Sequence, residues 1–169
     1  AAPSIDACVV RGNRSTSGGG IEVLEAAGTI SSCDVVANVA ESGHGGGVFL
    51  KGASTTIQAT SVRNNAASIE GGGLRVEDST PLLDNMVVTG NQARSGGGLS
   101  ITSSLGMVVG STFSDNRAVG ATGEPGVGGG IALDRSAPTL DGNSLLANSA
   151  TEHGGGISIS GRYCATDIC

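Results

Sequence analysis

The chain has 169 residues, a net charge of −6 and 30 glycines, with no tryptophan, one tyrosine and two phenylalanines. Its nine lysines and arginines are scattered and form no basic run, which excludes the electrostatic footprint of a nucleic-acid-binding protein. No stretch of 18 apolar residues is present, so the sequence predicts no membrane-spanning helix.

Three consecutive glycines followed by an apolar, a variable and an apolar residue recur along the chain. The copies begin at Gly18, Gly45, Gly71, Gly96, Gly128 and Gly154. From the last glycine of a copy to the next repeated asparagine the step is always 18 residues, whereas from that asparagine to the next triplet it varies from 5 to 12. A segment of constant length that alternates with one of variable length indicates stacked coils of strands, each closed by one variable loop.

Aliphatic side chains occupy the same positions in every repeat. Eight residues before the asparagine stand Ile5, Ile30, Ile57, Leu83, Val108 and Leu140, and three before it stand Val10, Val35, Val62, Val88, Phe113 and Leu145. After each glycine triplet, apolar and variable residues alternate with the period of a strand that has one buried face. We therefore predict an all-β fold, a parallel β-helix (solenoid) of about six coils with three short strands per coil. Coils of irregular length with asparagine corners are typical of the right-handed kind, and the strict hexapeptides of left-handed β-helices are missing.

The domain organisation follows from the same repeat. No change of composition and no linker interrupts it, so we expect residues 1–169 to form a single parallel β-helix domain. The first and last coils are incomplete, which predicts that this domain is a segment of a longer chain or that copies stack end to end.

The repeated asparagines predict a structural column at one corner of the coil: Asn13, Asn38, Asn65, Asn91, Asn116 and Asn148. Asparagine tolerates left-handed backbone geometry, and its amide can bond its copies above and below. Ten residues before each asparagine, a further corner is predicted at Pro3, Gly28, Thr55, Pro81, Gly106 and Pro138.

The cysteines suggest two disulfides. Cys8 and Cys33 both lie five residues before an asparagine, so they share one slot on neighbouring coils. Adjacent strands are about 4.8 Å apart, which is within the range of a disulfide, so we predict a Cys8–Cys33 bond; the alternative is two free buried thiols. Cys164 and Cys169 form the simplest second pair, although Cys169 also occupies the slot of Cys8 and Cys33 and could pair with a further coil. Paired cysteines indicate an oxidising, extracellular compartment.

His44 and His153 share one slot, but they stand four coils apart, about 19 Å at the usual strand spacing. They cannot share a metal ion, and we interpret both as solvated loop residues. No ligand spacing typical of zinc is present, so we predict neither a metal nor a cofactor.

The segment from Arg117 to Val127 is the longest departure from the repeat. Insertions in repeat proteins commonly lie on the binding face, so we select this segment as a candidate contact loop, with Arg117, Glu124 and Pro125 as its candidate residues. The alternative is a tolerated insertion without a function, because lengthening a surface loop costs little free energy.

The paired motifs resemble the repeats of the chlamydial polymorphic outer-membrane proteins, in which Gly-Gly-Ala-Ile-like and Phe-x-x-Asn motifs alternate. The stretch Phe113-Ser114-Asp115-Asn116 fits the second motif literally, and the other coils carry an aliphatic residue in place of phenylalanine. The resemblance covers nearly the whole chain. It implies a secreted or cell-surface protein, such as an autotransporter-type passenger or an adhesin.

We therefore expect a non-catalytic structural or adhesive rod at the cell surface, acting as a stalk or filament component or making a surface contact. Its expected partners are other protein chains, further coils stacked end to end, or surface glycans. The alternative function is polysaccharide binding, or a polysaccharide lyase or hydrolase. Such an enzyme needs clustered acidic residues, whereas in one outward slot Asp6, Asp84 and Asp141 lie on non-adjacent coils. An ice- or mineral-binding face would need a regular column of threonines, which the repeat does not contain.

Overall fold

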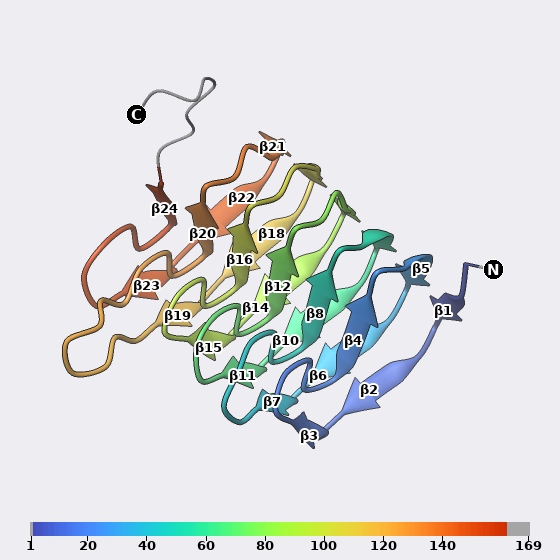
Figure 1. The fold of residues 1–169 in the computed structure, drawn as a ribbon, viewed down its shortest axis with the longest axis horizontal. Coiled ribbons are helices and arrows are strands. Elements are labelled where there is room, and N and C mark those ends of the chain that lie inside the picture. Colours follow the sequence, from blue (N-terminus) through green and yellow to red (C-terminus); the bar gives the residue numbers. More distant parts are fainter. Residues whose placement is uncertain (1, 162–169) are drawn as a thin grey trace.

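The computed structural model describes residues 2–161, which form a parallel β-helix (Figure 1). Every strand pairs only with the equivalent strands of the coils before and after it, always in parallel, and the strands build four sheets of six strands each. The predicted parallel β-helix is therefore confirmed. Each coil has a fourth strand that the alternation did not predict, because the two residues after the asparagine also pair with their copies.

We name the sheets A to D in the order in which a coil passes through them. Sheet A contains β1 (Ser4–Asp6), β5 (Ala27–Ser31), β9 (Ser54–Gln58), β13 (Leu82–Asp84), β17 (Met107–Val109) and β21 (Thr139–Asp141). Sheet B contains β2 (Val9–Arg11), β6 (Asp34–Val36), β10 (Ser61–Arg63), β14 (Val87–Thr89), β18 (Thr112–Ser114) and β22 (Ser144–Leu146). Sheet C contains β3 (Arg14–Ser15), β7 (Val39–Ala40), β11 (Ala66–Ala67), β15 (Gln92–Ala93), β19 (Arg117–Ala118) and β23 (Ser149–Ala150). Sheet D contains β4 (Ile21–Leu24), β8 (Val48–Lys51), β12 (Leu74–Glu77), β16 (Leu99–Thr102), β20 (Ile131–Asp134) and β24 (Ile157–Ser160).

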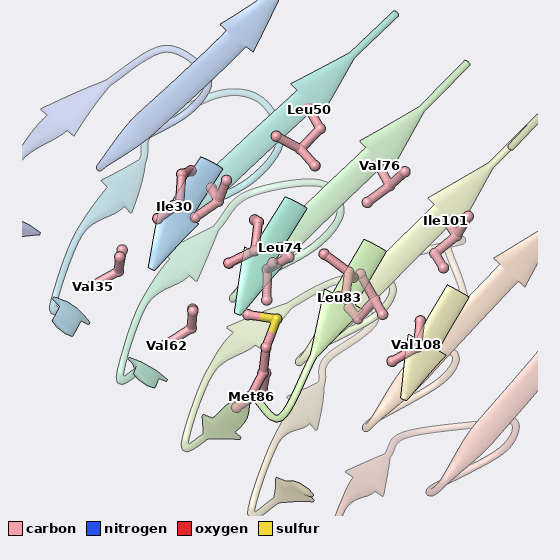
Figure 2. Close-up of a cluster of buried hydrophobic side chains, with 14 of the residues drawn as sticks. Ile30, Val35, Leu50, Val62, Leu74, Val76, Leu83, Met86, Ile101 and Val108 are labelled. Carbon is pink, nitrogen blue, oxygen red and sulfur yellow. The ribbon is translucent and has the colours of Figure 1, made fainter. Parts of the chain in front are cut away.

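The core is a set of aliphatic columns that run along the axis of the stack. Inward side chains from sheets A, B and D meet inside each coil (Figure 2). Ile57 on sheet A, Val62 on sheet B and Leu74 on sheet D are all fully buried, and each lies against its copy in the next coil. The repeated spacing thus produces a core of stacked aliphatic residues, and burial of this apolar surface stabilises the stack of coils.

The predicted asparagine column is present as a continuous ladder of hydrogen bonds from Asn13 to Asn148. At Asn65, for example, the backbone N–H and the side-chain Nδ2 both donate to Asn91 Oδ1, at 2.9 and 3.0 Å, and Nδ2 also donates to the Val35 carbonyl at 2.9 Å. Each buried side-chain amide therefore satisfies a backbone N–H and a backbone carbonyl of the preceding coil, which a turn alone would leave unpaired, and it also bonds the amide of the next coil.

The corners differ from the prediction in one respect. The left-handed residue is the one before each asparagine, such as Ala37 with φ 55° or Asn64 with φ 55°, rather than the asparagine itself. The further predicted corner is also displaced, because Gly28 and Thr55 lie within strands, whereas the left-handed bends fall three residues earlier, as at Glu25. The repeated asparagine is thus required for its hydrogen bonds and not for its backbone conformation.

The glycine triplets bring sheet C close to sheet D. Gly45 has φ 65°, which a residue with a side chain rarely adopts, and a Cβ on Gly46 would lie 2.3 Å from the Ala66 carbonyl oxygen. The alanines of sheet C are small for the same reason, and Ala40, Ala67 and Ala93 form a buried cluster of their own. The variable loops lie between the strand of sheet C and the glycine triplet that precedes the strand of sheet D.

Candidate functional site

The outer face of sheet D is unlike the other outer faces because loops cover it. Phe49, Arg75, Ser100 and Ala132 point away from the core, yet each is at most 6% exposed. The residues just before the glycine triplets stack in parallel across this face, through the bridges Glu70–Ser95, Ser95–Val127 and Val127–His153. The variable loops therefore form a second layer over sheet D, and the polar side chains between the two layers are the first candidates for function.

Arg75 lies at the centre of this layer. Its Nη1 is 2.7 Å from Glu70 Oε2 and donates to Ser100 Oγ at 2.8 Å and to Thr102 Oγ1 at 2.7 Å, while its Nη2 is 3.3 Å from Glu77 Oε2. The Arg75 side chain is only 5% exposed, so these contacts replace the hydration of its two Nη atoms, whereas its buried Nε has no hydrogen-bond partner among the described residues. Burying a guanidinium in this way is tolerated because two carboxylates and two hydroxyls surround it.

Lys51 and Glu77 extend the same cluster towards solvent. Lys51 Nζ is 2.8 Å from Glu77 Oε1, and this hydrogen bond raises the pKa of the lysine. Burial opposes ionisation of Glu77, but hydrogen bonds from Lys51 and Arg75 outweigh it and lower the pKa of the carboxyl. Glu77 is therefore held as a carboxylate, which suits an ion pair and does not suit a proton donor.

His44 belongs to this layer as well, which corrects the expectation of a solvated loop residue. Its ring lies against Phe49, with ring centroids 6.2 Å apart, and its Nδ1 is 3.5 Å from Glu70 Oε2 without a hydrogen bond. Burial, reinforced by the Arg75 guanidinium, lowers the pKa of His44 against the opposing Glu70 carboxylate. His153, by contrast, is exposed as predicted.

Beyond Arg75 the outer face of sheet D opens into a groove of about 190 Å³. The floor is low because the outward side chains after Arg75 in this column are all small, namely Ser100, Ala132 and Ser158. Glu70, Arg94, Ser95, Glu124, Pro125 and Val127 line it from the loop layer, and Asp134 and Ser160 from the sheet. Arg75, which reaches over Ser100, is next to the end of this groove.

The longest loop is folded as a hairpin at the side of the groove. Ala121 and Glu124 exchange backbone hydrogen bonds of 3.0 and 2.9 Å, and Gly123 at the tip has φ 79°. Glu124 Oε2 lies 3.4 Å from Arg94 Nη1, which ties the hairpin to the preceding coil. The loop between β19 and β20 projects beyond its neighbours (Figure 1). Of the three predicted contact residues, Glu124 and Pro125 line the groove, whereas Arg117 lies in strand β19 and does not.

The parallel pairing and the aliphatic columns agree with a comparison of the sequence with protein families. A family model described as right handed beta helix region matches residues 19–167. The chain belongs to the right-handed β-helix family. Searches of the curated proteins and of the solved structures gave no match to this β-helix. None of residues 2–161 forms a helix that is long and apolar enough to cross a membrane.

The side chains of the groove are suited to binding polar groups. In the part of the β-helix that the structure describes, no three histidine, cysteine or acidic side chains are grouped so that they could hold a metal ion. The carboxylates of the groove lie next to cations, Glu70 beside Arg75, Glu124 beside Arg94 and Asp134 beside Arg135. Such pairs hold charges in place and can exchange partners with a ligand at the exposed end.

Cys8 and Cys33 occupy neighbouring coils in the predicted register, but both are free thiols. Each side chain bonds within its own corner, Cys8 Sγ to the Asp6 carbonyl at 3.2 Å and Cys33 Sγ to the Ser31 carbonyl at 3.0 Å. The Cys8 N–H also points to Cys33 Sγ, at 3.4 Å. The predicted Cys8–Cys33 disulfide is therefore absent, because the cysteine sulfur caps the corner as Thr60 Oγ1 does one coil further on. The predicted Cys164–Cys169 pair lies outside the described residues.

Sequence reasoning found no cluster of acidic residues, whereas the register of sheet D places Lys51, Glu77 and Asp134 in one column. It missed Glu70 and Arg75, which complete the cluster from the loop layer and from the neighbouring column. A signal was available in the pattern, since Glu70 stands directly before a glycine triplet and Arg75 and Glu77 follow it two residues apart.

Proposed function

We propose that this β-helix is a non-catalytic structural or adhesive rod, displayed outside the cell, whose specific contact is made at the groove on sheet D. The single observation that carries the proposal is the position of the longest hairpin. It projects beyond the other loops, and its Glu124 and Pro125 line the groove of the otherwise covered sheet D face.

The carboxylates of the Arg75 cluster, beside the groove, support binding rather than turnover. A glycosidase needs a carboxyl group that holds its proton near neutral pH, and a lyase needs a base free to accept one. The pKa of Glu77 is lowered instead, and the nearby Glu70 is engaged by Arg75. These carboxylates therefore act as structural partners of a buried cation.

The extracellular location is supported by the resemblance of the repeats to surface proteins. The free thiols of Cys8 and Cys33 remove the disulfide argument for an oxidising compartment. The proposal thus depends on the repeat motif and on the rod-like stack of coils for its location, and on the groove for its contact.

The test uses a variant designed from the repeat itself. Deleting residues 120–126 shortens the step from Asn116 to Gly128 from 12 residues to the 5 found between Asn91 and Gly96, so the coil retains a native length. The labelled chain is applied to glycan arrays and to intact cells. We expect the wild type to bind and the deletion variant to lose binding with an unchanged circular dichroism spectrum. The control is Met107→Ser, which changes an exposed residue of sheet A.

A catalytic role has its own readout. The chain is incubated with polygalacturonate and with alginate, and release of unsaturated or reducing sugars is followed. Sustained release that Asp134→Asn abolishes would overturn the non-catalytic proposal and favour the lyase or hydrolase alternative. Binding that the hairpin deletion leaves unchanged would show that the contact lies elsewhere on the rod.

A further inference from the structure

The groove on sheet D has the dimensions of a short extended peptide. Its floor runs from Ser100 through Ala132 to Ser158, which are paired residues on three successive strands. Two strand spacings span about 10 Å, and an extended chain covers about 3.3 Å per residue, so the floor accommodates about three residues. The small side chains of the floor leave room for a backbone, and the hairpin forms one wall.

The charges that line the groove are mainly negative. Glu70, Glu124 and Asp134 line it, against one guanidinium, that of Arg94. Two further cations stand outside the lining: Arg75 is engaged with Glu70, and Arg135 lies beside Asp134 with its side chain 61% exposed.

Two of these carboxylates can accept a new partner. The Glu124 and Asp134 side chains are 56% and 39% exposed, and exposed ion pairs of this kind contribute only about 0–1 kcal/mol, so a ligand cation can replace the present ones. A ligand carboxylate would instead meet three carboxylates against one guanidinium, on a chain whose net charge is −6.

We propose that the groove binds an extended segment of a partner protein that carries a lysine or arginine side chain, with the cation seated between Glu124 and Asp134. This inference rests on the proposed contact function and names the partner chemistry of the same groove. A second copy of this chain is disfavoured as the partner because both copies are acidic. An acidic polysaccharide is disfavoured for the same electrostatic reason.

The test is an NMR titration of the isotope-labelled chain with the peptide acetyl-Gly-Lys-Gly-amide. We expect saturable shift changes confined to the residues that line the groove, which are residues 70, 94–95, 100, 124–125, 127, 132–134, 158 and 160. The same peptide with Nε-acetyl-lysine, which has no charge, and the peptide with glutamate in place of lysine should bind markedly more weakly. Raising the salt concentration should weaken the lysine peptide and leave the neutral one unchanged.

Variants should change the Kd of the lysine peptide in opposite directions, which a merely structural effect would not produce. Asp134→Asn and Glu124→Gln should each raise the Kd about two- to fivefold, and Arg94→Met should lower it by a similar factor, because it removes the competing cation. Asp84→Asn on sheet A makes the same change of charge away from the groove and should have no effect beyond that of net charge.

Several outcomes would overturn the inference. These are equal binding of the neutral or glutamate peptide, weaker binding by Arg94→Met, or shifts outside the groove. A neutral oligosaccharide that shifts the groove residues when the lysine peptide does not would also overturn it, while leaving the proposed contact function intact. Failure of the contact function itself is seen separately, as cell or glycan binding that survives deletion of residues 120–126.

Discussion

The buried Arg75 guanidinium and the half-buried Glu70 carboxylate form an ion pair, with Nη1 and Oε2 2.7 Å apart, that joins strand β12 to the loop directly before it. Glu70 is the last residue of the loop, and the chain turns at the following glycines into strand β12. The Arg75 side chain on this strand points back to the loop and contacts Glu70. The pair thus clamps the loop layer to the sheet, and the groove begins where this clamp ends.

Replacing Arg75 with methionine should destabilise the fold by about 3 kcal/mol, because Glu70 and Glu77 lose a cation that is 5% exposed. Urea unfolding followed by circular dichroism measures the change. Arg63→Met is the control, since Arg63 pairs with Asp34 at the surface and its loss should cost less than about 1 kcal/mol. Equal losses in the two variants would show that the Arg75 cluster is not a clamp.

Replacing Asn91 with alanine should cost about 3 kcal/mol or more. The substitution leaves the Val62 carbonyl without its donor at 2.9 Å and the Asn65 N–H without its acceptor at 2.9 Å, in a column that is fully buried there. Amide exchange should accelerate at Asn65 ahead of global unfolding. The same change at Asn13 removes only one side-chain bond at an exposed position, so it should cost about 1 kcal/mol or less. A ladder that tolerates both changes equally would contradict this account.

The stability of the chain should fall as the pH drops through about 6.5, the pKa of an unperturbed histidine. The pKa of His44 is lowered in the folded state, by burial and by Arg75 and Arg94 against Glu70 and Glu77. The unfolded state therefore binds more protons between the two pKa values, so acidification favours unfolding in that window and has no further effect through His44 below it. Urea unfolding midpoints at about pH 7.5 and about pH 5.5 measure how steeply the stability depends on pH.

The matched variants are His44→Gln and His153→Gln. We expect the first to flatten the slope and the second to leave it unchanged, since His153 is exposed. A slope that survives His44→Gln would assign the pH dependence to other groups.

The thiols of Cys8 and Cys33 should differ in reactivity. In a chain with Cys164 and Cys169 replaced by serine, iodoacetamide should label Cys8 rapidly in the folded state, because it is exposed, and Cys33 only after unfolding, because it is 3% exposed. Mass spectrometry without added reductant counts the labelled thiols. Finding both unlabelled even in denaturant would show that the two sulfurs are bonded to each other.

The repeat by itself determined the register of the coils. Ile57 and Val62 stand at a fixed distance before Asn65, and Leu74 stands at a fixed distance before Asn91. A parallel ladder can satisfy its hydrogen bonds only if equal positions stack. The asparagine column follows from the same argument. These features are local and repeated, so the sequence of each coil imposes the same register on its neighbours.

The tertiary structure alone decided what lies over sheet D. The loops differ in length and sequence, so no repeated constraint predicts that Glu70 and His44 fold back onto Arg75 and Phe49, or that the hairpin at Glu124 stands beside a floor of small side chains. The direction of a side chain within its corner is equally unspecified by register, which is why Cys8 and Cys33 stack without bonding. Hydrogen bonding between coils sets the positions of the backbone, whereas the burial of charged and polar side chains between two layers is settled only when both layers are in place.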